Sequence, residues 1–389
     1  MKAYYESSRK LKDLRELRNP DKENLRNVLE TIKDDVELAL YFYDVLEPKW
    51  VELLDEVSEF DGLGEEQTGM IGKYKAHYLR QCAETQAEAV LRIIEKIEVQ
   101  DMNIQGTLIG AIVKMPEETA VKGVELLATY LDKQEKTFWY GIGKVAAELM
   151  VKLVVSHPRE ALEIAEVLLD AWVSKEKTYG KEIATRFSKD EYSELMLEHY
   201  NKVWEAHPER AIKVLVETLS RCLDSLDEDG KNEKGYDARI SGYGLELGDL
   251  NEIDMKHPDI QTVLVKGICE AGKVLIEKEK EKVSEVLDLL EGTHRVIFLR
   301  IAMYLLRFTK PRTESVRINR LIGNKDYFEK YNHCWNEHRR LLNDRFDDVS
   351  EEAKKAFLEW IEEDKYSKER REEIQKLNKE NDRKPPDFD

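Results

Sequence analysis

The stretch WEAHPERAIKVLVETL, residues 204–219, decides the fold because two earlier stretches repeat its pattern. Residues 154–169 read VVSHPREALEIAEVLL, and residues 113–131 read VKMPEETAVKGVELLATYL. In each stretch a proline separates two helical patterns. Proline disfavours a helical conformation in the preceding residue, while its fixed φ suits the first turn of a helix. The sequence therefore predicts a helix, a tight turn and a second helix, repeated along the chain.

Apolar residues follow each proline at helical spacing and predict one buried face per helix. They are Ile212, Leu215, Leu219 and Cys222 after Pro208, then Leu162, Ala165, Leu169 and Trp172 after Pro158, and, with a slight slip, Ala120, Val124, Leu127 and Leu131 after Pro116. The prolines lie 42 and then 50 residues apart, close to the period of about 40–47 residues in HEAT-type hairpins. We interpret His157 and His207, which precede two of the prolines, as parts of the turns rather than as catalytic residues.

The predicted fold is all-α: an α-α superhelix of paired helices, a solenoid of the HEAT or armadillo type, with one irregular acidic insertion. Its parts are N-terminal capping helices in residues 1–34, helical repeats in 35–223, the acidic, glycine-containing insertion in 224–256, helical repeats in 257–364, and a charged helix with a disordered tail in 365–389. The insertion carries ten acidic and four basic residues and five of the 19 glycines, a composition that favours irregular structure. The His-Pro at His257 does not extend the pattern, because the residues after it resemble the first helix of a pair.

Composition narrows the functional classes. Of the 389 residues 37% are charged, and the net charge of -18 repels a polyphosphate backbone at long range. The four cysteines have no metal-type spacing and indicate free thiols in a reducing compartment. No apolar run is long enough for a leader or a membrane span. We predict a cytoplasmic protein with protein partners and no membrane contact.

Several short motifs partly match the sequence patterns of known binding sites, but each departs from the pattern that the site requires. GICEAGKV, residues 267–274, matches the spacing of a P-loop but ends in Val274, where a magnesium ligand is required. LDEDGKNEKGYD would place Ser225 and Tyr236 at the anchor positions of a calcium loop. In YNHCWNEHRR, His333 and His338 are five residues apart and point in different directions on a helix. The glycines of GIGKVAAE and GMIGKYK suit close helix packing. We therefore predict no catalytic residue, no cofactor and no metal site, and hence no enzyme.

One segment departs from the acidic character of the chain. Residues 294–325, which we call the arginine-rich segment, contain one acid, Glu314, against eight cations: Arg295, Arg300, Arg307, Lys310, Arg312, Arg317, Arg320 and Lys325. These cations either pair with acidic faces of neighbouring helices or form a basic groove for an acidic peptide, a phosphate-bearing ligand or nucleic acid. We name them as candidate binding residues.

Three segments resemble helical-repeat regions of large multidomain prokaryotic proteins, many of which carry NTPase or other effector modules and are linked to antiviral defence. The resemblance lies in Tyr41, Phe42, Pro48, Trp50, Leu53 and Phe60, in Asn103 with Met115 and Pro116, and in Glu337, Leu341, Leu342, Phe346, Val349, Ser350, Trp360 and Ile361. These pieces bracket residues 35–364. The resemblance implies a scaffold or recognition region, usually attached to an effector, so the chain is either a fragment of a longer protein or a stand-alone relative.

The expected function is a non-enzymatic scaffold, or a sensor or regulatory module, within a prokaryotic defence-type assembly. A nucleic-acid-binding helical repeat that uses residues 294–325 is the alternative, and the net charge disfavours it. An enzyme with its site in the 224–256 insertion is a third interpretation.

Overall fold

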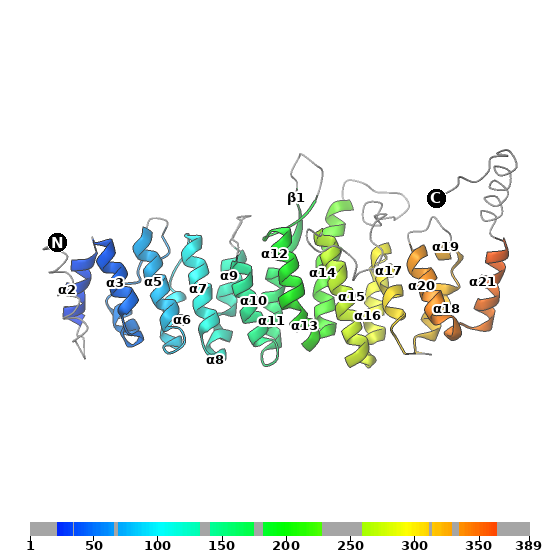
Figure 1. The fold of residues 1–389 in the computed structure, drawn as a ribbon, viewed down its shortest axis with the longest axis horizontal. Coiled ribbons are helices and arrows are strands. Elements are labelled where there is room, and N and C mark those ends of the chain that lie inside the picture. The colour runs from blue at the N-terminus through cyan, green and yellow to red at the C-terminus, as the bar shows by residue number, and fades with distance from the viewer. Residues whose placement is uncertain are drawn as a thin grey trace, which may run out of the picture. The chain divides into compact units, whose positions relative to one another are not determined.

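The computed structural model describes residues 22–33, 35–65, 69–132, 141–174, 182–227, 259–310, 313–328 and 334–363. This part of the chain is mostly helical, as predicted (Figure 1). It divides into two compact units. The first contains the described residues up to 227 together with 259–274, and the second contains those from 275 to 363.

The first unit consists of α2 (Lys22–Ile32), α3 (Val36–Val45), η1 (Pro48–Trp50), α4 (Val51–Glu56), α5 (Gly69–Cys82), α6 (Ala87–Ile94), α7 (Met102–Lys114), α8 (Glu117–Ala120), η2 (Val121–Gly123), α9 (Val124–Asp132), α10 (Ile142–Leu153), α11 (Pro158–Leu168), β1 (Ala171–Ser174), β2 (Glu182–Thr185), α12 (Lys189–Glu194), the π-helix η3 (Leu195–Tyr200), α13 (Asn201–Ala206), α14 (Pro208–Asp227) and most of α15 (Ile260–Lys278). The second unit continues with η5 (Lys280–Lys282), α16 (Val283–Gly292), α17 (Val296–Leu306), α18 (Ser315–Ile322), α19 (Lys325–Phe328), α20 (Trp335–Arg345), η6 (Phe346–Asp348) and α21 (Glu351–Glu363).

The predicted turns lie where the prolines place them. Helix α10 ends at Leu153 and α11 begins at Pro158, with His157 in the N-cap position. Helix α13 ends one residue before His207, and α14 begins at Pro208. Both histidines thus belong to helix junctions, as the sequence predicts.

Contacts join successive turns in the first unit. The His207 ring nitrogen Nε2 lies 2.9 Å from the carbonyl oxygen of Val154. One repeat earlier, the Lys152 ammonium donates to the carbonyl oxygens of Val113, at 3.1 Å, and of Met115. Each turn is therefore tied to the turn before it.

The helices of the first unit follow one another in chain order (Figure 1). Helix α5 packs against both α3 and α7, and α7 packs in turn against α10. Helices α4 and α6 form a second series of neighbours, and α11 contacts both α9 and α10. Each of these central helices therefore touches its own hairpin partner or the equivalent helix of an adjacent hairpin.

The predicted apolar stripes are buried. Ile212, Leu215, Leu219 and Cys222 have no exposed surface. The stripe after Pro116 is buried as well, and its slipped spacing coincides with the 3-10 turn η2, which interrupts the helix between α8 and α9. The close packing predicted for GIGKVAAE is also present, since a Cβ on Gly143 would lie 2.8 Å from the ring of Phe187.

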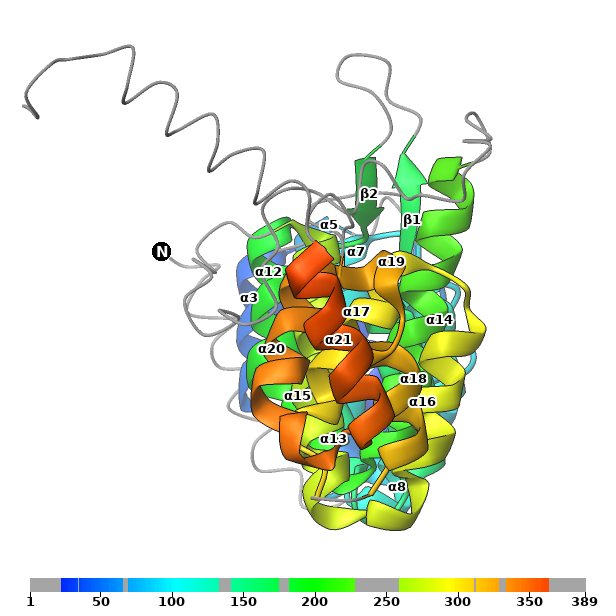
Figure 2. The same ribbon diagram turned by 90° about the vertical axis from the view of Figure 1, so that its right-hand side faces the viewer.

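One prediction about the stripes is wrong. Trp172 was expected on the helix that follows Pro158, but α11 ends at Leu168 and Trp172 lies in strand β1. The strand pairs antiparallel with β2, with Trp172 opposite Ala184. The two strands lie side by side, and β1 packs against α14 of the first unit (Figure 2). Asp170, between α11 and β1, accepts hydrogen bonds from Arg221 on α14 and from Arg186 after β2, and these long-range contacts stabilise the departure from the helix.

Several predicted parts fall largely outside the described residues. Of the N-terminal capping region, α2 is helical, while residues 1–21 are not described. The first four residues of the 224–256 insertion continue α14. The remainder of that insertion, His257 and the 365–389 tail also lie outside the described part of the chain.

Candidate binding site in the arginine-rich segment

The arginine-rich segment begins before α17 and ends in α19, within the second unit. Arg295 occupies the N-cap position of α17, and Lys310 follows that helix in an exposed position. Lys325 is the first residue of α19 and is exposed. Arg312 lies outside the described residues. The other four cations, Arg300, Arg307, Arg317 and Arg320, each contact a carboxylate.

Arg300 is buried in the packing between α17 and α20. Its guanidinium donates two hydrogen bonds of 2.9 Å to the carboxylate of Glu337, one to each oxygen. Side-chain exposure is 4% for Arg300 and 2% for Glu337. This bidentate geometry matches the planar guanidinium to the carboxylate. Arg300 is therefore unavailable to a ligand.

Arg307 lies two helical turns further along α17 and pairs with Asp344 of α20. The distance from its Nε to the Asp344 Oδ2 atom is 2.6 Å. The guanidinium also lies 5.7 Å from the ring centroids of both Tyr304 and Phe308, a separation typical of a cation–π contact. These contacts hold the side chain against α17 and α20.

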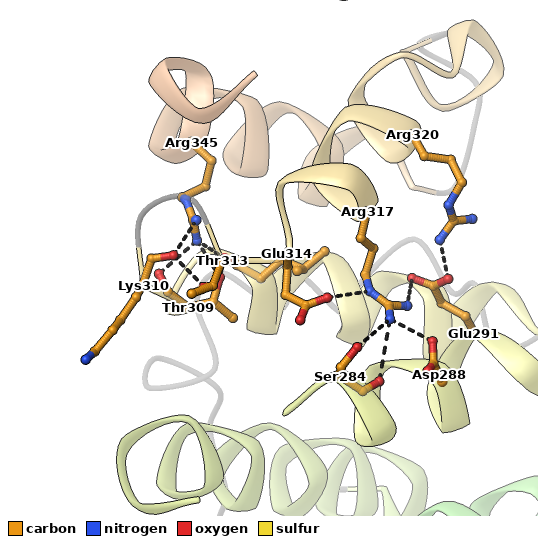
Figure 3. Close-up of polar contacts among 11 residues, drawn as sticks. Ser284, Asp288, Glu291, Thr309, Lys310, Thr313, Glu314, Arg317, Arg320 and Arg345 are labelled. Carbon is orange, nitrogen blue, oxygen red and sulfur yellow. Dashed lines mark hydrogen bonds and ion pairs between the residues drawn. The ribbon is translucent and has the colours of Figure 1, made fainter. Parts of the chain in front are cut away.

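Arg317 is the centre of a polar cluster at the start of α18 (Figure 3). Its guanidinium contacts Asp288 at 2.6 Å and Glu291 at 2.9 Å on α16, and Glu314 at 3.1 Å. Burial by itself lowers the pKa of Arg317, but hydrogen bonds to the three carboxylates outweigh it, so the pKa is raised. Glu314 has a left-handed backbone, with φ of 57°, a conformation that is costly for a side-chain-bearing residue. The ion pair helps to hold that turn.

A hollow of about 490 Å³ adjoins this cluster and is lined in part by Ser284, Asp288, Glu291, Val316 and Arg320. Arg320 pairs with Glu291 on the wall of the hollow. The lining thus combines carboxylates with the guanidiniums that neutralise them. Such a nearly balanced surface lacks the positive potential that attracts a polyanion.

Arg345 was missed by sequence reasoning, although it organises the centre of the segment (Figure 3). Only 5% of its side chain is exposed. From α20 it donates to the carbonyl oxygen of Leu306, the last residue of α17, and to those of Thr309 and Lys310 in the turn that follows. It also pairs with Asp348 at 2.6 Å. The last carbonyls of a helix lack partners within the helix and carry partial negative charge. Arg345 satisfies them and fixes the turn that leads to α18.

The sequence does contain a signal for these pairs, in the spacing between opposite charges. Asp288 with Arg317 and Glu291 with Arg320 are both 29 residues apart. Arg300 with Glu337 and Arg307 with Asp344 are both 37 apart. A constant spacing is expected where two helices of adjacent hairpins pack in register, because residues one turn apart then meet partners one turn apart.

The candidate metal ligands of YNHCWNEHRR do not converge in the described part of the chain. His333 lies outside it, and Glu337 is occupied by Arg300. Burial raises the pKa of the Cys334 thiol to about 12 and lowers the pKa of His338, whose Nε2 faces the carbonyl oxygen of Ile322. Among the described residues, no group of three or more potential ligands is placed to hold a metal ion. No helix there is long and apolar enough to span a membrane.

The four cysteines are buried free thiols.

Comparisons of the chain with known protein families, with curated proteins and with solved structures find no match.

Proposed function

We propose that the chain is a non-enzymatic protein-interaction scaffold built as a HEAT-like superhelix of paired helices. The observation that supports it best is the contact between successive turns, in which side chains of one helix junction reach carbonyl oxygens of the preceding junction. Repeated contacts between nearest neighbours are the organising feature of helical-repeat proteins. In such arrays the hairpins stabilise one another through their buried stripes, and the outer faces are free to vary for recognition.

Ion pairs between neighbouring hairpins support the same proposal. In the first unit Arg92 contacts Glu52 and Lys96 contacts Asp55, at spacings of 40 and 41 residues. The second unit repeats this arrangement at spacings of 29 and 37. Within each pair of packed helices the spacing is constant or nearly so, as expected for stacked hairpins whose helices pack in register.

The nucleic-acid alternative loses its main support, because four of the eight cations of the arginine-rich segment are paired with carboxylates. A phosphate backbone would have to displace those carboxylates before it could bind. We therefore favour protein partners. Assignment to a defence-type assembly rests on the resemblance of residues 35–364 alone.

Two measurements test the proposal. Small-angle scattering on the full chain should give a radius of gyration well above about 21 Å, the value expected for a compact globule of 389 residues. A radius near that value would refute the superhelix.

The second measurement concerns the partner. The tagged full-length chain, isolated from the cells that encode it with and without nuclease treatment, should retain a stoichiometric protein partner in both cases. A chain that associates only with nuclease-sensitive material would refute the scaffold function in favour of the nucleic-acid alternative.

A further inference from the structure

Helices α5 and α7 pack against each other and contain no acidic residue. They comprise 14 and 13 residues. Aspartate and glutamate account for 80 of the 389 residues of the chain, so about six would be expected in helices of this combined length. An acid-free pair of neighbouring helices is therefore unusual in this protein and leaves its cations unopposed by their own helices.

Three basic side chains of α5 lie along one stripe. Lys73, His77 and Arg80 follow one another at intervals of four and three residues, which places them on one helical face. Lys73 and His77 are exposed, and Arg80 is partly exposed. In contrast Lys75, on another face, pairs with Glu59 at 2.6 Å. Within the described part of the chain, none of the three stripe residues forms an ion pair.

Arg80 extends across the neighbouring helix. A Cβ on Gly110 of α7 would lie 3.0 Å from the Arg80 Nε atom and 3.3 Å from its Cζ, so the guanidinium packs closely over the glycine backbone of α7. Nε is buried and has no hydrogen-bond partner among the described residues. The side chain thus bridges α5 and α7 without an anion to neutralise it.

Two side chains continue the surface on α7. Thr107 is partly exposed and lies one turn before the buried Gly110, while Lys114 is exposed and lies one turn after it. We call the surface of Lys73, His77, Arg80, Thr107 and Lys114 the α5–α7 face.

Exposed carboxylates also occur on the helices next to α5 and α7. Glu37 and Asp44 are exposed on α3, and Glu148 is exposed on α10. Glu84 is exposed just beyond α5. The basic residues without an ion pair therefore form only a short strip along α5 and α7, which suits an extended segment better than a broad polyanion.

We infer that the α5–α7 face binds an acidic segment of a protein partner, an inference that rests on the proposed scaffold function. Charge complementarity identifies the chemistry of the partner, because unpaired cations on a protein of net charge -18 attract carboxylates locally. A nucleic acid is the poorer fit, since its binding strength grows with the number of neutralised phosphates and this strip is narrow and short.

The test uses a fluorescein-labelled peptide of about ten residues, alternating glutamate and serine, and a thymidine oligonucleotide of similar length as the competing class. Fluorescence anisotropy measures binding of each probe to the full-length chain across a salt series. Lys73→Glu reverses an exposed charge of the α5–α7 face, and His77→Glu places a second carboxylate on it. Thr107→Glu adds a carboxylate to the face without removing a cation.

The matched control combines Arg26→Gln with Arg210→Glu, two exposed positions on α2 and α14. It changes the net charge by the same amount as the Lys73→Glu and His77→Glu pair. Thermal unfolding by circular dichroism checks that every variant remains folded.

The expected result is salt-sensitive binding of the acidic peptide, weakened about tenfold by Lys73→Glu with His77→Glu and reduced by Thr107→Glu, while the control stays within about twofold of wild type. An equal loss in the control would overturn the inference, because only net charge would then matter. Tighter binding of the oligonucleotide, with loss in the same variants, would also overturn it.

Carbodiimide crosslinking of the free chain tests whether another segment of the same chain, or a second copy of it, occupies the α5–α7 face. Crosslinks from Lys73 to the chain's own residues 228–258 or 364–389, or to a second copy, would show that no separate partner is required and would overturn the inference. Failure of the peptide to bind, in a chain that still retains a protein partner on isolation, would overturn the α5–α7 face and leave the scaffold function intact.

Discussion

Replacement of Glu337 by leucine should destabilise the second unit severely, because it leaves Arg300 charged and buried. The two side chains are 2% and 4% exposed and share two hydrogen bonds of 2.9 Å. A buried ion pair contributes little net stability compared with apolar residues, but removal of one partner strands the other charge away from water. The variant therefore tests both the burial and the pairing.

The expected cost of Glu337→Leu is about 3–5 kcal/mol. The double variant Arg300→Met with Glu337→Leu removes both charges and replaces them with apolar groups of similar size. Its stability should return to within about 1–2 kcal/mol of wild type or exceed it. Recovery in the double variant is the distinctive outcome, since two independent defects would instead add.

Arg307 and Asp344 provide the matched control, because they join the same two helices at the same spacing of 37 residues. Their side chains are 19% and 33% exposed, so solvent screens the pair. Asp344→Leu should therefore cost no more than about 1 kcal/mol.

Urea unfolding followed by circular dichroism measures these differences. Limited proteolysis mapped within residues 275–363 assigns the loss to the second unit. A cost below about 1 kcal/mol for Glu337→Leu, or a double variant as unstable as the single one, would contradict the buried bidentate pair.

Three further outcomes are expected. Leu215→Asp buries a charge in the first unit and should lower the free energy of unfolding, measured by thermal unfolding, by more than about 4 kcal/mol. Lys213→Asp, on the exposed face of the same helix, should cost less than about 1 kcal/mol. Equal effects would refute the assigned helix face. Arg345→Met should cost about 2–4 kcal/mol and expose residues 306–310 to amide hydrogen exchange; unchanged protection there would show that the arginine does not hold the turn. Burial lowers the pKa of His338, so the unfolded state binds a proton more readily than the folded state, and stability should fall as the pH drops below about 6.5. His338→Gln should show a shallower loss of stability between about pH 6.5 and 5. An unchanged pH dependence would refute the burial of His338 in its neutral form.

The helix pairs were predictable because their signals are local. Pro158 and Pro208 end one helix and begin the next through the geometry of their own rings, and Leu215 and Leu219 repeat with the period of a single helix. None of these inferences needs information about residues far away in the chain. The prediction failed at Trp172, where the helical period continues in the sequence but Asp170 is held by Arg186 and Arg221, which lie 16 and 51 residues away.

The arginine-rich segment also shows that a local signal omits contacts to residues far away in the chain, here for the prediction of a binding site. Its charge count is a property of 32 consecutive residues, whereas the carboxylates that neutralise Arg300, Arg307 and Arg317 belong to neighbouring helices. A composition window contains the cations and omits their partners. The equal sequence spacing between oppositely charged residues indicates these partners, but it can be recognised only once the helices of adjacent hairpins are known.

The α5–α7 face was missed for the opposite reason. Lys73, His77 and Arg80 are too few to raise the charge of a sequence window, and Lys75, which lies among them, is paired with Glu59. What distinguishes the face is the lack of carboxylates on two helices that are separated in sequence and packed together in the fold. The chain has 80 acidic and 62 basic residues, and most cations in its described part contact a carboxylate. A cation without one is therefore more informative about binding than a cluster of cations with several, which is why we place the acidic partner on α5 and α7 rather than on the arginine-rich segment.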